Sequence, residues 1–359
     1  MDMDPELSAV LDKLGVSQSA FPVDSIAEAR AACEASFTEP HKAFMESSLP
    51  PADAYTLTDH TVLVDGGEIT VRCLIPIVDD EEERFPVLVN LHGGGMSSLV
   101  KFASCERLGR KLTVVGTASF PGWSVGSTEM DDCVLRIRCV KYKLSIVNVE
   151  YRLAPEHPFP TPLNDCYDAL RWTASNTSLL KADLGKGFIV GGESAGGNMS
   201  AVLAHIVRDD PFFEGRRLTG QFLCEPQVCH NAAYPERLKS KFQSLFELTG
   251  EPTLTEWMLT PFYAWYNAPA SDPRFSPLLY PSHKGLPRAY IQAMGLDLLR
   301  DDALVYAEVL REAGVEVEID LHPGVPHAFY YCFPFISAAA KVRDGADRGI
   351  EWLLRVNRD

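Results

Sequence analysis

A serine flanked by glycines, Ser194 in residues 191–197, is the side chain best placed to act as a nucleophile. It follows a short apolar run at 187–190 and precedes a helix-like segment at 198–207. A serine on such a strand-to-helix turn takes a strained backbone with positive φ, and glycines beside it avoid clashes with neighbouring elements. The helix N-terminus also points backbone N–H groups at the place where an oxyanion would form. Five-residue glycine–serine patterns also arise by chance, so the chemistry depends on partner residues.

A serine hydroxyl needs a base within hydrogen-bond reach, and that base needs an acid to fix its tautomer. In an α/β sheet, such groups are expected on loops at the carboxyl ends of later strands. Asp297 follows a predicted strand at 289–293, and His327 follows a predicted strand at 315–321. The sequence therefore predicts a catalytic triad of Ser194, Asp297 and His327.

Three nearby residues compete for these roles. Asp301 and Asp302 open a predicted helix at 301–313, where acids are favoured as N-terminal residues. His322 ends the strand itself, a turn too early, and is interpreted as a structural residue at the sheet edge.

The run His-Gly-Gly-Gly at 92–95 directly follows a buried, apolar strand predicted at 85–91. Consecutive glycines let backbone N–H groups approach a substrate oxygen without obstruction from side chains. We expect Gly93, Gly94 and Ala195 to form an oxyanion hole. This run is much rarer by chance than the glycine–serine pattern, so the two together strengthen the assignment.

Apolar strands alternate with helices over most of the chain, which predicts an α/β fold with a mostly parallel central sheet covered by helices on both faces. Residues 61–64 and 69–74 read as a hairpin around Asp65-Gly66-Gly67. The predicted organisation comprises an N-terminal helical cap segment at 1–55, a catalytic domain at 56–359, an aromatic-rich, helix-like cap insertion at about 227–267 and an unusual loop insertion at about 96–122.

The composition excludes several classes of protein. The 359 residues carry a formal net charge of −16, which argues against binding to nucleic acid or to anionic membranes. Nine scattered cysteines without metal-ligand spacing give no support to a metal site, and no cofactor motif is present. No signal peptide and no run of ~20 apolar residues occurs, so we expect a cytoplasmic protein without stable membrane insertion.

Five motifs together resemble the hormone-sensitive-lipase-type family of α/β-hydrolase esterases. They are His-Gly-Gly-Gly at 92–95, Tyr-Arg-Leu-Ala-Pro-Glu-His-Pro-Phe-Pro at 151–160, Gly-Glu-Ser-Ala-Gly-Gly at 192–197, Gly-Leu-Asp-Leu-Leu-Arg-Asp at 295–301 and His-Ala-Phe at 327–329. The resemblance implies an α/β-hydrolase fold with a helical cap. It also implies hydrolysis of carboxylic esters by Ser194, His327 and Asp297. The stretch at 151–160 is interpreted as structural.

Three features depart from the family pattern. Glu193 stands where the family usually has aspartate, and Leu298 replaces the usual proline after the acid. The third is the material at 96–122, which separates the glycines at 93–95 from the segment at 123–127 that normally follows them closely. This insertion is either a loop that shapes the pocket or translated intron sequence. If it is ordered against the site, we expect it to displace Gly93 and Gly94 and to weaken activity.

The predicted function is that of a serine carboxylesterase acting through an acyl-enzyme on a small-molecule ester with a small-to-medium acyl group, acetyl being one candidate, and an apolar or aromatic alcohol. Two alternatives stay open: an acyltransferase that uses the same triad, and a non-catalytic small-ligand receptor on the same fold. A homodimer is also left open.

Overall fold

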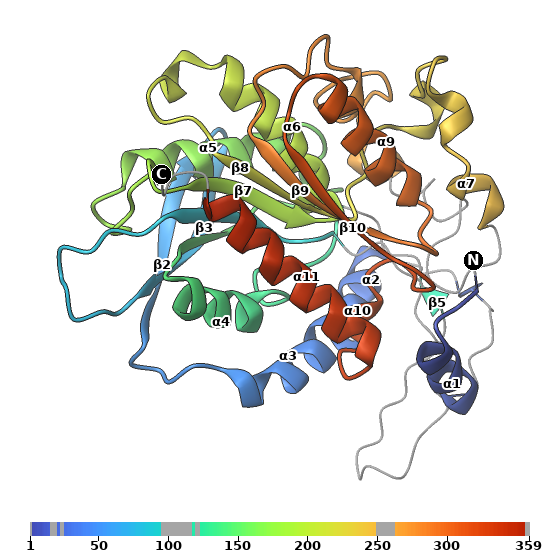
Figure 1. Ribbon diagram of the computed structural model, residues 1–359, viewed down its shortest axis with the longest axis horizontal. Helices are drawn as coiled ribbons and strands as arrows, with labels where there is room; N and C mark the ends of the chain where they lie inside the picture. The colour runs from blue at the N-terminus through green and yellow to red at the C-terminus, as the bar shows by residue number, and fades with distance from the viewer. Residues whose placement is uncertain are drawn as a thin grey trace.

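A computed structural model (Figure 1) describes residues 2–14, 20–21, 25–94, 117–118, 123–248 and 263–355. Its strands are β1 Ala20–Phe21, β2 Tyr55–Val64, β3 Gly67–Pro76, β4 Val87–Leu91, β5 Thr117–Ala118, β6 Ser145–Glu150, β7 Phe188–Glu193, β8 Gly220–Cys224, β9 Arg288–Met294 and β10 Val317–His322. Eight of them form one sheet in the order β10-β9-β8-β7-β4-β6-β3-β2, and β1 pairs with β5. The β2–β3 and β3–β6 pairs are antiparallel, and the other pairs in the sheet are parallel.

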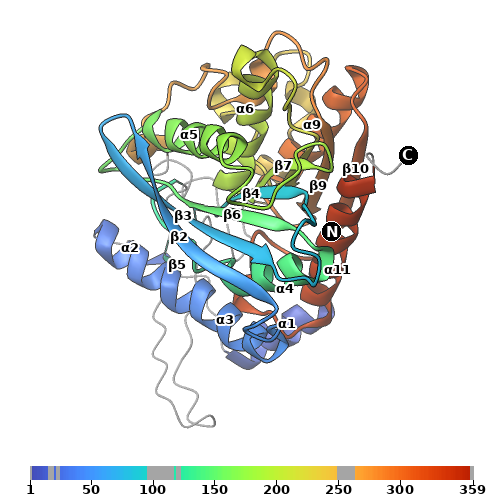
Figure 2. The same ribbon diagram turned by 90° about the vertical axis from the view of Figure 1, so that its left-hand side faces the viewer.

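Helices cover both faces of this sheet, with α5, α6 and α9 on one face and α4 and α11 on the other (Figures 1 and 2). The α-helices are α1 Pro5–Leu14, α2 Ile26–Cys33, α3 Glu39–Met45, α4 Asp132–Tyr142, α5 Thr161–Ser175, α6 Ala195–Asp209, α7 Ser244–Glu247, α9 Arg300–Glu312, α10 Phe329–Cys332 and α11 Ser337–Leu354. On β7, Ile189 belongs to the apolar cluster of α4 and α11, whereas Val190 belongs to that of α5 and α6. This alternation follows from the two-residue period of a strand buried on both faces.

The predicted α/β-hydrolase fold is confirmed, and its central strands owe their burial to their composition. All five residues of β4 are buried, whereas every residue of β10 is exposed or half-buried because the strand lies at the edge of the sheet. His322 is the last residue of that edge strand, as predicted. In the N-terminal segment, α2 ends at Cys33, and a π-helical turn, Glu34–Thr38, leads directly into α3.

In its described part, the cap insertion at 227–267 holds α7, a further helical stretch at 263–266 and two 3₁₀ turns, Asn231–Ala233 and Lys239–Lys241. Carboxylates of α9 accept four backbone N–H groups of this segment: Asp302 accepts those at 228 and 229, and Asp301 accepts those at 243 and 244, where α7 begins. Residues 249–262 of this insertion lie outside the described residues, as does the insertion at 96–122 apart from β5.

The N-terminal helices pack over the loops that follow the sheet. Phe37 and His41 place their rings edge-on against Tyr331 in α10. Near the N-terminus, Asp4 donates its backbone N–H to Gly324 O at 2.7 Å. Arg30 of α2 pairs with Glu156 at 2.7 Å. These contacts bind the segment before β2 to the loops around residues 156 and 324–331.

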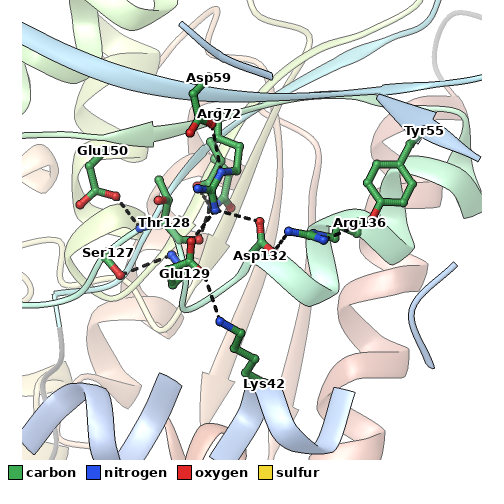
Figure 3. A network of polar contacts seen from close by, with 12 residues as sticks. Lys42, Tyr55, Asp59, Arg72, Ser127, Thr128, Glu129, Asp132, Arg136 and Glu150 are labelled. Carbon is green, nitrogen blue, oxygen red and sulfur yellow. Dashed lines mark hydrogen bonds and ion pairs between the residues drawn. The ribbon is translucent and has the colours of Figure 1, made fainter. Parts of the chain in front are cut away.

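A polar network centred on Arg72 joins the hairpin to the N-terminal helices and to the start of α4 (Figure 3). Arg72 bonds Asp59, Glu129 and Asp132, with N–O distances of 2.5–3.1 Å. Lys42 of α3 donates to Glu129, and Arg136 pairs with Asp132. We call these six residues the Arg72 network: Lys42, Asp59, Arg72, Glu129, Asp132 and Arg136.

Among the residues that the structure describes, no helix combines the length and apolarity needed to cross a bilayer.

Candidate active site

Ser194, His327 and Asp297 form one chain of hydrogen bonds. The Ser194 Oγ lies 3.1 Å from His327 Nε2, and His327 Nδ1 lies 2.7 Å from Asp297 Oδ2. All three side chains are buried, with the residues at most 1% exposed. The arrangement allows Nε2 to accept the hydroxyl proton while Nδ1–H is donated to the carboxylate.

Ser194 lies on the sharp turn between β7 and α6, with φ 51° and ψ −111°. Glycines make this turn possible, because a Cβ at Gly192 or Gly196 would overlap the carbonyl oxygen of Leu91 on β4. The Ser194 N–H donates to Cys224 O on β8 at 2.8 Å. The serine is thus fixed above β4 and β8, and Ala195 is the first residue of α6, where helix N–H groups favour negative charge.

Asp297 lies three residues beyond β9. Its Oδ1 accepts the backbone N–H of Leu299 at 2.9 Å, which leaves Oδ2 for His327. Leu298, which replaces the proline of the family pattern, is buried in a small leucine cluster, and its carbonyl accepts the Ser244 hydroxyl at 2.7 Å. Packing and this bond therefore hold the loop that the missing proline would have stiffened.

The loop that carries His327 is tied to the loop that carries Asp297. Gly295 N–H donates to His322 O, and Leu296 N–H donates to Val325 O. These two backbone bonds set the distance between acid and base, because one joins the residues after β9 to the end of β10 and the other joins them to the loop that follows.

The expected oxyanion residues lie beside the serine turn. His92, Gly93 and Gly94 are buried, whereas Gly95 lies outside the described residues. The His92 ring stacks on Tyr151 with centroids 4.1 Å apart, and the Tyr151 hydroxyl donates to His92 O. Gly126 packs so closely on Gly93 that a Cβ would overlap Gly93 O. The segment after the insertion thus contacts the glycine run directly, as the family pattern suggested.

Glu225 is a buried acid in the site that the sequence analysis did not consider. It follows β8 directly, and its Oε2 lies 3.3 Å from His327 Nδ1 and accepts the Ala328 N–H at 2.9 Å. The signal available in the sequence was its place at the end of a predicted core strand, the same edge as Ser194 and Asp297.

Glu225, Asp297 and His327 are also the group of described residues whose potential metal-ligand atoms lie within 4.8 Å of one another. The Asp297–His327 distance is that of a hydrogen bond, so the cluster is built to handle a proton.

Burial and like charges shift the titration of this cluster. Burial opposes a charged imidazole, but the carboxylates of Asp297, Glu225 and Glu193 outweigh it and raise the pKa of His327 to about 9. Burial and the charges of Glu193 and Asp297 raise the pKa of Glu225 well above its usual value, although His327 opposes this rise. Burial, then the charge of Asp131, raises the pKa of Glu193 to about 7.

Glu193 is the last residue of β7 and directly precedes the nucleophile. It lines a cavity of about 60 Å³ with Asp131, Tyr330 and Tyr331. The Tyr331 hydroxyl donates to Asp131 at 2.7 Å. The carboxylate beside the nucleophile is therefore part of a buried polar layer under the turn.

The competing residues have structural partners. Asp301 and Asp302 lie in the first turn of α9, as predicted, but their carboxylates accept backbone N–H groups at 228–229 and 243–244. In the 151–160 stretch, Arg152 pairs with Asp165 at 2.6 Å, and its Glu156 bonds Arg30. That stretch anchors the loop and the N-terminal helix.

Three comparisons with known proteins relate this chain to α/β-hydrolases. A model of a family with the alpha/beta hydrolase fold matches residues 121–331. Carboxylesterase NlhH of Mycobacterium tuberculosis is 33% identical over 361 residues, which cover 99% of this chain and 96% of that protein. The versiconal hemiacetal acetate esterase of Aspergillus parasiticus is 30% identical over 308 residues, which cover 85% of this chain and 85% of that protein.

The crystal structure of vibralactone cyclase superposes with a TM-score of 0.88 at 36% identity, covering 100% of this chain and 96% of that chain. Together with the strand order and the five motifs, these matches establish that the chain belongs to the hormone-sensitive-lipase-type family of α/β-hydrolases, a family of carboxylic ester hydrolases.

Proposed function

We propose that the protein hydrolyses a carboxylic ester through an acyl-enzyme on Ser194. The observation that carries this proposal is the unbroken chain of hydrogen bonds from Ser194 through His327 to Asp297. His327 takes the hydroxyl proton as Ser194 attacks the carbonyl carbon, then gives it to the leaving alcohol. Asp297 orients the imidazole, and a water activated by His327 then releases the acid.

The oxyanion of each tetrahedral intermediate is bound by the N–H groups of Gly93, Gly94 and Ala195. Gly126 supports this arrangement by its close contact with Gly93 O. A Gly126→Ala variant adds a methyl group at φ +90° against that carbonyl, so it displaces the glycine run. We expect kcat to fall about 10²-fold, the order of one lost oxyanion donor, with a smaller change in KM. An unchanged kcat would remove Gly93 from the proposal.

The proposed substrate is an ester with a small-to-medium acyl group, such as acetyl, on an apolar or aromatic alcohol. The similarity to an esterase named for a hemiacetal acetate supports acetyl. The described aromatic residues of the 227–267 segment offer less support, because Tyr266 stacks on Trp123 and Phe242 stacks on Tyr234 inside the protein. p-Nitrophenyl esters of increasing acyl length decide the point: a preference for acetate supports the proposal, and a preference for long chains contradicts it.

We also propose that residues 1–55 and the 227–267 insertion together form the cap over the site. Contacts of Phe37 and His41 with Tyr331, four residues after His327, support the first part. The free, mostly buried cysteines among the described residues support a reducing location inside the cell.

The test of the proposed function is Ser194→Ala against a small aryl ester, together with labelling by a fluorophosphonate probe. We expect turnover to fall by about 10⁶-fold, as for other nucleophile deletions, and labelling to vanish while thermal unfolding is retained. Absence of labelling in the wild type would favour the receptor alternative, and wild-type-like turnover in the variant would exclude Ser194 as the nucleophile.

A second candidate is transfer of the acyl group to a hydroxyl of the same substrate, which closes a ring. The observations that favour it are the TM-score of 0.88 with vibralactone cyclase and the burial of the three triad side chains, which limits the access of water. Turnover in H₂¹⁸O separates the two reactions: hydrolysis places one ¹⁸O in the released acid, whereas ring closure places none in the product.

A further inference from the structure

His327 Nδ1 faces two carboxylates rather than one. Asp297 Oδ2 lies at 2.7 Å and Glu225 Oε2 at 3.3 Å. The two acids come from the ends of neighbouring parallel strands, β9 and β8. They therefore reach the same ring edge from two adjacent strand ends.

Glu225 is held in place by a backbone bond to β9 and a side-chain bond to the histidine loop. Its backbone N–H donates to Gln292 O on β9 at 2.9 Å, and its Oε2 accepts the N–H of Ala328, the residue after the base. The preceding residue, Cys224, accepts the Ser194 N–H. Glu225 also has φ +49°, a conformation that a non-glycine residue adopts rarely and that aims its side chain at the histidine loop.

Among the described residues, the ion pairs of Glu225 include no lysine or arginine, and its one ionic partner is His327. Its other oxygen, Oε1, is buried without a hydrogen-bond partner there. A buried carboxyl group with no fixed cation is costly unless it has a functional partner. The imidazolium that forms on His327 during the reaction is such a partner.

We propose that Glu225 is a second acid partner of His327: a positioning residue that holds the Nδ1 edge of the ring beside Asp297 and replaces Asp297 when that carboxylate is removed. This inference rests on the proposed esterase function, because it concerns the base of that reaction. As Ser194 Oγ–H gives its proton to Nε2, the ring becomes positive, and Nδ1–H remains bonded between the two acids.

The electrostatics of the cluster explain why Glu225 becomes the charged partner of His327 only when Asp297 is removed. Two carboxylates so close together resist simultaneous ionisation, and the charge of Asp297 is among the causes that raise the pKa of Glu225. Removal of the Asp297 charge therefore makes Glu225 easier to ionise, and the ionised group then stabilises the imidazolium in place of Asp297. The titratable groups that face Glu225 are Asp297, Glu193 on β7, Cys224 on β8, His327 and Tyr330 on α10.

A double-mutant cycle in the full-length protein tests the proposal, with kcat/KM for p-nitrophenyl acetate and the rate of fluorophosphonate labelling as readouts. We expect Glu225→Gln to lose less than about 5-fold and Asp297→Asn about 10²-fold, because Glu225 still holds the ring. The double variant should lose about 10⁴-fold, the order seen when a triad acid has no substitute, which exceeds the product of the single losses. A loss equal to that product or smaller overturns the proposal.

Asp302→Asn is the matched control, because Asp302 is an equally buried acid that accepts two backbone N–H groups without contact to His327. In the double variant Asp297→Asn/Asp302→Asn, the loss of kcat/KM should equal the product of the two single losses. A loss larger than that product would mean that removal of any buried acid has this effect, which overturns the proposal.

If the double variant does not fold, Asp297→Asn alone decides. Because Glu225 then ionises and holds the ring, the rate of fluorophosphonate labelling should stay within about 10²-fold of wild type, and a loss of about 10⁴-fold, the order for a triad acid without a substitute, overturns the proposal. Failure of the proposed function would give a different result. In that case the wild-type protein neither hydrolyses the ester nor reacts with the probe, so there is no activity whose loss could be compared between variants.

Discussion

The acids of the Arg72 network and the acids around His327 are both withdrawn from water, but their partners differ. Asp132, with a side chain only 3% exposed, is bound by both Arg72 and Arg136. Glu129 bonds Arg72 and Lys42, which lowers its pKa although burial opposes this. Around His327, the pKa values of Glu225 and Glu193 are raised instead, because burial and neighbouring negative charges act together.

The two clusters therefore differ in role: the acids of the Arg72 network stabilise the fold, whereas the acids around His327 bind and release protons. Permanent cations keep the network ionised and fix the hairpin against α3 and α4 (Figure 3). The site acids face a histidine, whose charge appears and disappears, so their affinity for protons changes with the state of the base. Substitutions in the two clusters should therefore have effects of opposite sign on stability.

Loss of Arg72 should have the largest effect on stability. Arg72→Gln leaves the buried Asp132 with one cation, so we expect the free energy of unfolding to fall by about 3 kcal/mol at pH 7. The pKa of Glu129 is lowered in the folded state, so its contribution is present above the unfolded pKa and is lost as pH falls through the folded value. The difference between variant and wild type should therefore shrink in acid. Urea unfolding from pH 7 downwards measures it.

Lys42→Met is the matched control in the same network, because its ion pair with Glu129 is partly exposed. It should cost about 0.5 kcal/mol. Equal losses from the two substitutions would mean that burial of Asp132 is not what makes the network important.

The next largest effect should be the rise of kcat/KM with pH. The pKa of His327 is raised to about 9, so the neutral base becomes abundant only as pH approaches that value. We expect kcat/KM for an aryl acetate to rise roughly 50-fold between pH 7 and pH 9, after subtraction of the rate with Ser194→Ala. If kcat/KM had already reached its plateau at pH 7, the three carboxylates would not raise the pKa of His327 as we expect.

Removal of a site carboxylate should give a smaller effect of opposite sign. The folded-state pKa of Glu193 is raised to about 7, so the folded protein binds an extra proton between the unfolded pKa and pH 7, and stability falls as pH rises through that window. Glu193→Gln lacks this loss and should be more stable than wild type by roughly 2 kcal/mol at pH 8. Glu193 is also among the carboxylates that raise the pKa of His327, so the difference between the two proteins includes the change in His327 titration. A less stable variant at pH 8 would contradict the comparison.

Much of the fold could be predicted because its signals are local. The apolar run of β4, the Asp65-Gly66-Gly67 turn and the alternation of strands with helices indicate the sheet without any long-range information. Contacts between distant segments could not be predicted in this way: the carboxylates of Asp301 and Asp302 bind backbone N–H groups at 228–229 and 243–244. These bonds join a helix to a segment distant in the chain, so no local pattern reports them.

The sequence by itself determined which residues can do the chemistry and in what order they occur, because glycines around Ser194 and the loops after two strands restrict where Asp297 and His327 can lie. Only the tertiary structure decided what surrounds them. The proximity of Glu225 to His327 depends on the adjacency of β8 and β9 and on a left-handed backbone at Glu225, and neither is written in residue spacing. The Arg72 network likewise joins residues from four segments, since charges pair by distance in space, which chain folding alone sets.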